Sequence, residues 1–284
     1  MWKSKLCLGT AEHYGISTKE QIKLFKKTGF EAFFVNWDKN VDIRDIKEYA
    51  DEIGMIFQSI HAPFEKSADM WTTGEKADIA VAELMECLND CAENNVPIMV
   101  CHAFIGFQNH SPNNCGIENF RKVVEKAKIV SVKIAFENTE GEEYLMALMN
   151  AFADYENVGF CWDTGHEMCY NHSNDMMKLY GSKIICTHLN DNLGIKDYNG
   201  KIIWTDDLHL LPGDGVADWK NIAHRLNQYN YNDILTFELN KISKPDRHEN
   251  DVYTRMSIEG YVCEAYKRAC MVATIKKNDK NADL

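Results

Sequence analysis

Histidines and carboxylates recur where short apolar runs of this sequence end. In chain order they are His61, His102, Glu137, Asp163, His166, His188, Asp191 and Glu238. Imidazole and carboxylate groups are ligands that divalent metal ions accept in proteins. The set therefore predicts a metal centre, provided that the fold brings the ends of these runs together.

Each residue also has an ordinary structural interpretation. Asp163-Thr164 could cap the helix that follows, and a lone histidine is more often a structural residue than a ligand. What favours the metal centre is the recurrence of these residue types at six run ends, because random placement would scatter them along the helices as well.

The apolar runs alternate with longer segments of helical periodicity, which predicts eight strand–helix units. The expected strands are 5–11, 31–37, 56–63, 97–104, 133–139, 158–163, 184–189 and 233–239. The expected helices are 17–29, 42–54, 75–95, 116–130, 142–155, 175–180, 218–229 and 252–277. Nearly continuous apolar runs such as Ile98–Cys101 are typical of buried parallel strands.

Eight such units predict one α/β domain, a single (β/α)8 TIM barrel over residues 1–284 with a frayed tail at 278–284. An open doubly wound sheet is the alternative, but the segment from Gly9 to Gly15 lacks its glycine-rich fingerprint. The carboxyl ends of barrel strands meet on one face, where active sites are built. The predicted ligands would therefore converge.

The composition narrows the classes of partner and the cellular location that we expect for this protein. The chain has 284 residues, 31 Lys and Arg against 43 Asp and Glu, and a net charge of −12, which disfavours nucleic acid as a partner. No apolar run is long enough for a membrane helix or a secretory signal. The ten cysteines form no Cys-x-x-Cys pair, so we expect a reducing, cytoplasmic location.

Longer strings around the candidate residues add specificity. They are Phe136-Glu137-Asn138-Thr139, Trp162-Asp163-Thr164-Gly165-His166, Thr187-His188-Leu189-Asn190-Asp191, His209-Leu210-Leu211-Pro212-Gly213-Asp214-Gly215 with Asp218-Trp219, and Thr236-Phe237-Glu238-Leu239. With these strings in this order, residues 5 to 275 resemble the xylose isomerase-like TIM barrel superfamily of sugar isomerases, epimerases and endonuclease IV.

The resemblance to the epimerase branch, which includes D-tagatose 3-epimerase, implies one divalent ion, Mn²⁺ before Mg²⁺, Co²⁺ or Zn²⁺. Its ligands would be Glu137, Asp163, His188 and Glu238. Glu137 and Glu238 would also be the catalytic pair that exchanges a proton with a sugar. The residues expected to contact the substrate are Glu143, His166, His61, His102, His209 and Trp37. The branch places an arginine where this chain has Gly194.

These residue types suit proton transfer. Removing a proton α to a sugar carbonyl leaves an enediolate, whose charge a metal ion stabilises, and two carboxylates on opposite faces can remove and return the proton. The same site could move a hydride, and the sequence does not separate the two reactions. The expected partner is a small sugar or a sugar-derived ketone. The sequence has no glycine-rich segment of the kind that binds phosphate, which favours an unphosphorylated substrate. The protein could form a homo-oligomer, but the sequence does not reveal the oligomeric state.

Endonuclease IV, a tri-zinc phosphodiesterase that cleaves abasic DNA, is the rival. Nine residues match the order of its ligands: His61, His102, Glu137, Asp163, His166, His188, Asp207, His209 and Glu238. Against it, the Leu-Pro-Gly-Asp-Gly string resembles the isomerases, and only Lys39 and Arg44 stand near the second strand to contact phosphates. A metal-free binding barrel is disfavoured, because its buried carboxylates would lack charge partners.

One further segment is long for a connection in a barrel. The stretch from Asn190 to Val216 joins His188 to Asp207 and His209, and Asn199-Gly200 within it is a turn signal. We expect it to form a hairpin that closes over the site.

Overall fold

Eight parallel strands form the centre of the molecule. The computed structural model describes residues 4–107, 111–171, 174–195 and 202–282. The strands are β1 (Leu6–Gly9), β2 (Ala32–Asn36), β3 (Ile56–His61), β4 (Ile98–His102), β5 (Lys133–Glu137), β6 (Val158–Asp163), β7 (Ile184–His188) and β8 (Leu235–Phe237). Their order is β7-β6-β5-β4-β3-β2-β1-β8, and a parallel bridge between Leu189 and Phe237 brings β7 to β8. The predicted (β/α)8 barrel is confirmed.

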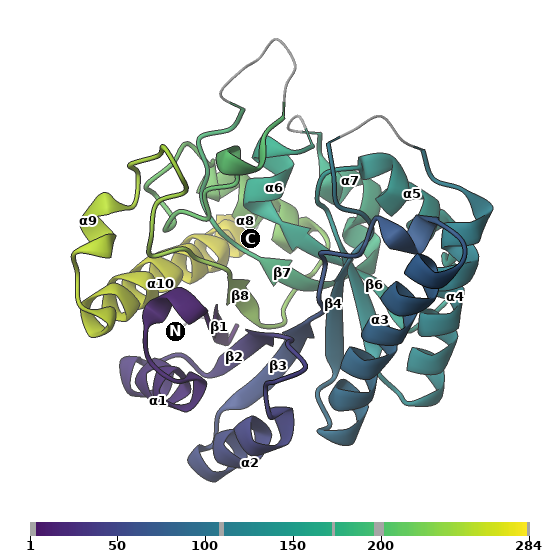
Figure 1. Ribbon diagram of the computed structural model, residues 1–284. Coiled ribbons are helices and arrows are strands. Elements are labelled where there is room, and N and C mark those ends of the chain that lie inside the picture. Colours follow the sequence, from purple (N-terminus) through teal and green to yellow (C-terminus); the bar gives the residue numbers. More distant parts are fainter. Residues whose placement is uncertain (1–3, 108–110, 172–173, 196–201, 283–284) are drawn as a thin grey trace.

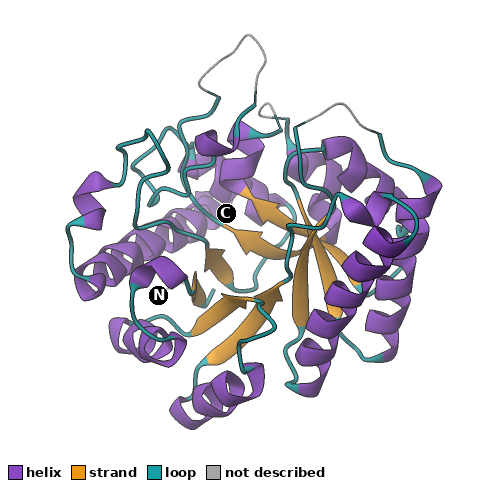
Figure 2. Ribbon diagram, viewed as in Figure 1, coloured by secondary structure: helices purple, strands orange, loops and turns teal. Residues whose placement is uncertain are grey.

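Helices surround this ring of strands (Figures 1 and 2). They are α1 (Thr18–Thr28), α2 (Ile43–Ile53), α3 (Glu75–Glu93), α4 (Asn114–Ile129), α5 (Glu142–Ala151), α6 (Thr164–Cys169), α7 (Met176–Tyr180), α8 (Trp219–Gln228), α9 (Asp251–Thr254) and α10 (Ile258–Ala282). Short 3₁₀ turns cover Glu12–Tyr14, Asp69–Trp71, Gly181–Lys183 and Trp204–Asp206. The described part of the chain has no helix long and apolar enough to cross a bilayer.

The largest differences from the predicted helices are an additional short helix and a later start of the closing helix. Helix α6 follows β6 without a gap, and its six residues are too few to show a helical period in sequence. The closing helix begins only at Ile258, after the separate α9, and it ends at Ala282 instead of residue 277.

The barrel interior is packed beneath its carboxyl-terminal face. Side chains that point outward from the strands, such as Phe33 and Phe136, join the large core shared with the helices. Inward-pointing side chains are mostly small, as in the cluster of Ile98, Val100, Ala135, Cys161 and Cys186. All ten cysteines are free thiols, and most are buried. Because the barrel interior is packed, the carboxyl-terminal ends of the strands are held in place, and so are the side chains located at these ends.

Candidate metal centre and active site

Four of the predicted ligands meet at the carboxyl-terminal face of the barrel. Glu137, Asp163 and His188 are the last residues of β5, β6 and β7, and Glu238 directly follows β8. One ligand atom from each lies within 4.8 Å of one atom from every other. Three carboxylates and one imidazole thus face a common point.

His188 joins the two glutamates of this group. Its Nδ1 lies 2.9 Å from Oε1 of Glu137 and 3.2 Å from Oε2 of Glu238. The ring is stacked with Phe34 on β2, at 4.9 Å between centroids, and with His61 on β3, at 5.7 Å. These two stacked contacts restrict the orientation of the imidazole plane.

Asp163 is fixed by neighbouring strands and by its own helix. Its Oδ1 accepts the backbone N–H of His166 at 2.6 Å and caps α6, while its Oδ2 accepts the side-chain amide of Asn190 at 2.8 Å. The amide of Asn138 donates to the Asp163 carbonyl oxygen at 2.8 Å. Asn138 of the Glu-Asn-Thr string thus fixes the backbone of Asp163, and Asn190, which follows His188 by two residues, orients its carboxylate.

Two further groups of ligand type adjoin the first. His61 and His102 bring Nε2 atoms to 3.2 Å and 3.3 Å from Oε2 of Glu137, which makes Glu137 common to two groups. The third group is His166, Asp207 and His209. His209 reaches Asp207 Oδ1 at 2.9 Å from a left-handed backbone conformation with φ of 48°.

Imidazoles supply the charge compensation within these groups. Burial alone would raise the pKa of Glu137, but His188, His102 and His61 together hold that pKa well below its usual range. Burial opposes ionisation of Glu238 too, yet His188 and His209 lower its pKa to about 2. For Asp163 burial prevails and raises the pKa to about 6.

A divalent cation suits this donor set. The ion pairs described for Glu137, Asp163 and Glu238 involve histidines alone, without lysine or arginine. Two buried imidazole nitrogens, Nε2 of His188 and Nδ1 of His102, have no hydrogen-bond partner within the described residues. Buried carboxylates without a fixed cation are costly unless paired or metal-bound.

A cavity of about 560 Å³ opens above the three groups. Its described lining consists of Asn36, His61, Phe64, His102, Ile105, Phe107, Glu140, His166, Tyr170, Trp204, Asp207, His209, Glu238, Asn240 and Lys244. We refer to it as the metal-side cavity. The glutamates differ in access: the Glu238 side chain is 23% exposed and lines the cavity, whereas Glu137 is 0% exposed beneath it.

Several lining residues were not predicted from the sequence. Glu140 follows Glu137 by three residues, and its Oε1 accepts the Gly106 N–H at 3.0 Å. Trp204 and Lys244 come from loops, and the Lys244 ammonium lies 5.5 Å from the Trp204 ring. For Glu140, the strand-end position was the available signal; no spacing rule places a loop lysine over a distant tryptophan.

Two residues expected to contact substrate are not among the residues that line the metal-side cavity. Glu143 lies on α5, and Trp37 lines a neighbouring cavity while its indole N–H donates to Asp90 at 2.6 Å. Their contacts with a sugar remain predictions. His61, His102, His166 and His209 do line the metal-side cavity.

Asp191 has a structural role. Its carboxylate accepts the N–H groups of Gly213 at 2.7 Å and Ala217 at 2.9 Å and the Trp219 indole N–H at 3.0 Å. Its backbone pairs with Leu210 in both directions at 2.9 Å. These bonds hold the Leu-Pro-Gly-Asp-Gly loop beside the site. The predicted turn at Asn199-Gly200 lies outside the described residues.

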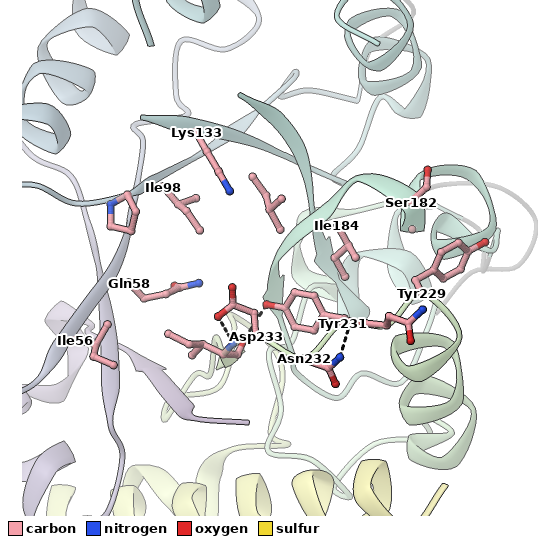
Figure 3. A pocket seen from close by; sticks show the side chains of 15 residues that line it. Ile56, Gln58, Ile98, Lys133, Ser182, Ile184, Tyr229, Tyr231, Asn232 and Asp233 are labelled. Carbon is pink, nitrogen blue, oxygen red and sulfur yellow. Dashed lines mark hydrogen bonds between the residues drawn. The ribbon is translucent and has the colours of Figure 1, made fainter. Parts of the chain in front are cut away.

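The opposite end of the barrel carries a separate cavity of about 620 Å³ (Figure 3). Gln58, Lys133, Tyr231 and Asp233 line it, near the amino-terminal ends of the strands. None of the ligand groups described above reaches it, so the candidate chemistry is confined to the carboxyl-terminal face.

Comparisons with known proteins agree with this architecture. The uncharacterised protein y4fM of Sinorhizobium fredii (strain NBRC 101917 / NGR234) is 32% identical over 153 residues, covering 49% of this chain and 45% of y4fM. The match thus spans less than half the length of that relative.

Two solved structures share the fold over nearly the whole chain. The IolI protein with a zinc atom superposes with a TM-score of 0.75 at 20% identity, over 95% of this chain and 98% of IolI. An L-ribulose 3-epimerase superposes with a TM-score of 0.74 at 15% identity, over 99% of this chain and 97% of the epimerase. The family model described as xylose isomerase-like TIM barrel matches residues 22–256, and this chain belongs to that family.

Proposed function

We propose that the protein is a divalent-metal-dependent isomerase or epimerase of sugars or sugar-derived ketones, acting by proton transfer. The observation that carries this proposal is the placement of Glu137 and Glu238 at the same imidazole nitrogen, Nδ1 of His188, and in one ligand group with Asp163. Glu238 lines the metal-side cavity, and Glu137 lies beneath it. Solved structures of this fold include an L-ribulose 3-epimerase and a zinc-bound protein, which supports the same class.

We assign the residues to two roles, metal binding and substrate binding. Glu137, Asp163, His188 and Glu238 would hold the metal ion, which when bound stabilises negative charge on two adjacent substrate oxygens. Mn²⁺ suits three carboxylates and one imidazole, as do Mg²⁺, Co²⁺ and Zn²⁺. His61, His102, His166 and His209 would contact sugar hydroxyls from the cavity wall.

Proton transfer would begin at the exposed glutamate. A carboxylate oxygen of Glu238 takes the proton from the carbon next to the carbonyl, and the C–H electron pair moves to form the enediolate. A different proton is delivered to the opposite face by a second carboxyl group, for which Glu137 is the candidate. Glu137 would take this proton up from solvent, and Glu238 would release the abstracted proton to solvent, which restores both groups. The low pKa of Glu238 keeps its carboxylate ionised at neutral pH.

Solvent deuterium exchange tests this proposal. The metal-loaded protein, incubated in D₂O with a panel of ketoses, is expected to introduce deuterium next to the carbonyl. Glu238→Gln and Glu137→Gln should each abolish exchange while circular dichroism stays unchanged. Glu140→Gln is the matched control, because Glu140 lines the same cavity outside the ligand groups.

Two results would contradict the proposal. Full exchange in Glu238→Gln would remove that residue from the proton path. Isomerisation by the wild type without any exchange of label would replace proton transfer by hydride transfer.

A second candidate, a tri-metal phosphodiesterase of the endonuclease IV type, is favoured by one specific observation. The nine residues that match its ligand order fall into the three groups described above. Few cations support a nucleic-acid backbone, since Lys244 is the one lysine or arginine in the described lining of the metal-side cavity. Metal analysis separates the two: one ion per chain supports the isomerase, and three zinc ions with cleavage of abasic DNA support the nuclease.

A further inference from the structure

A second cavity of about 690 Å³ lies beside the metal-side cavity, above β1 and β2. Its lining includes Thr10, Glu12, His13, Trp37, Asp38 and Val41. We refer to it as the β1–β2 cavity. Four residues line both cavities, namely Asn36, Phe64, Glu238 and Asn240. Glu238, the exposed glutamate of the proposed reaction, therefore stands where the two cavities meet.

The charges of the residues that line the β1–β2 cavity disfavour an anionic occupant. Its carboxylates come from Glu12, Asp38, Glu65 and Glu238, and the described lining contains no lysine or arginine. His13, the one imidazole of this lining, is neutral at physiological pH, because burial lowers its pKa to about 4. A phosphate or carboxylate in this cavity would meet four carboxylates, and no lysine or arginine among the described lining residues would contact it directly.

Neutral polar groups are available at the junction. The side chains of Asn36 and Asn240 line both cavities, and neither amide makes a side-chain hydrogen bond within the part of the chain that the structure describes. An amide offers two donor hydrogens and an acceptor oxygen, which matches the hydroxyl groups of a sugar. Trp37 adds an aromatic wall, held in place by its bond to Asp90.

The volumes of the two cavities also favour a sugar ligand that occupies both of them. Each of the two cavities alone lies within the range of ~300–1,000 Å³ that holds a whole small-molecule ligand. One sugar ring therefore leaves the neighbouring cavity free for a second group of similar size, joined to the first ring beside Glu238.

We propose that the substrate is an unphosphorylated keto-glycoside with two sugar rings. The reacting ring lies in the metal-side cavity, and the glycosidically linked ring lies in the β1–β2 cavity with Asn36 and Asn240 at the linkage. This inference rests on the proposed function for the reacting ring, and it assigns the β1–β2 cavity as a binding subsite.

The test compares a hexose that carries a keto group at a ring carbon other than the anomeric carbon with its methyl glycoside, the corresponding keto-disaccharide and the phosphate ester of the keto-hexose. In each of these compounds the keto group stays free when the anomeric carbon is substituted. Binding to the metal-loaded protein is measured by calorimetry, and deuterium exchange is measured separately. We expect the keto-disaccharide to bind at least tenfold more tightly than the methyl glycoside and to show a correspondingly higher kcat/KM. Tighter binding of the phosphate than of the unphosphorylated sugars would overturn the proposal.

Variants that fill the β1–β2 cavity locate the effect. Val41→Trp, and Glu65→Trp at an exposed position where bulk leaves the core intact, should remove the tenfold advantage of the disaccharide and leave the methyl glycoside unaffected. Val252→Trp, at an exposed position on α9, is the control. Equal binding of disaccharide and methyl glycoside by the wild type refutes the subsite. Retained disaccharide preference without exchange of any sugar supports the subsite and refutes the proposed reaction.

Discussion

Oδ1 of Asp163 accepts the backbone N–H of His166 at 2.6 Å, so the residue that caps α6 is also a member of the four-residue ligand group. The sequence left the cap and the ligand as alternatives, and in the structure the cap bond fixes the Asp163 carboxylate within the group of ligand-type residues. A ligand whose orientation is fixed in advance loses little freedom when an ion binds.

Substitutions at Asp163 should separate the two roles. Asp163→Asn keeps an oxygen for the cap but removes the charge, so we expect metal affinity to fall at least about 100-fold, more than for loss of a residue that only supports a ligand. After chelator treatment, the free energy of unfolding of Asp163→Asn should lie within about 1 kcal/mol of the wild-type value. Asp163→Ala should be less stable by a further ~1 kcal/mol, because it also loses the helix cap. Metal titration and urea unfolding measure both effects. Equal metal affinity in Asp163→Asn would contradict the ligand role.

Gly165 is required by close packing against Asn190. A Cβ at residue 165 would lie 1.9 Å from Oδ1 of Asn190, the side chain that holds Asp163. Gly165→Ala should therefore displace Asn190, lower metal affinity by about 10–100-fold and reduce stability by about 1–3 kcal/mol. Gly260→Ala is the control, because its Cβ meets the flexible Met256 side chain. Wild-type metal affinity in Gly165→Ala would show that Asn190 does not orient Asp163.

Asp191 should matter for stability. Asp191→Ala leaves the Trp219 indole and two backbone N–H groups of the loop without their buried acceptor, so we expect a loss of at least about 3 kcal/mol. Asp218→Ala removes an exposed cap of α8 and should cost about 1 kcal/mol. Urea unfolding of chelator-treated protein compares the two. Similar losses in both variants would contradict the anchoring role.

The sequence predicts the barrel well, because parallel strands buried on both sides leave continuous apolar runs and because helix caps such as Ser17 are local signals. It also predicts which strand ends carry ligand-type residues, since strand polarity alone sends them to one face. The convergence of Glu137, Asp163, His188 and Glu238 follows from the topology without any knowledge of side-chain contacts.

Side-chain direction is what the sequence does not reveal. Asp191 stands in the same string as His188, yet it turns toward the N–H groups of a distant loop. Lys244 and Trp204 are brought together by loop conformations that no periodicity encodes. The unequal exposure of Glu137 and Glu238 depends on three surrounding histidines from other strands, which is a property of the assembled face.

Acid stability should depend on His13. This side chain packs edge-on against Tyr14, and its Nε2 accepts the backbone N–H of Lys241 at 3.2 Å. Burial lowers its pKa from 6.5 to about 4, with Lys241, His209 and Lys244 adding repulsion. The unfolded chain therefore binds a proton at this residue at higher pH than the folded protein. The stability from neutral His13 is complete above pH 6.5 and is lost as the pH falls toward 4.

The variant His13→Gln should lose less stability between pH 7 and pH 4 than the wild type does, by at most about 3 kcal/mol. Glutamine retains an oxygen that can accept the Lys241 N–H and has no proton to gain. Urea unfolding of both chelator-treated proteins at several pH values gives the comparison, and the variant His224→Gln, at an exposed position on α8, is the control. If the curves of wild type and His13→Gln run parallel from pH 7 to pH 4, His13 keeps its ordinary pKa in the folded protein, and the burial argument for this residue is wrong.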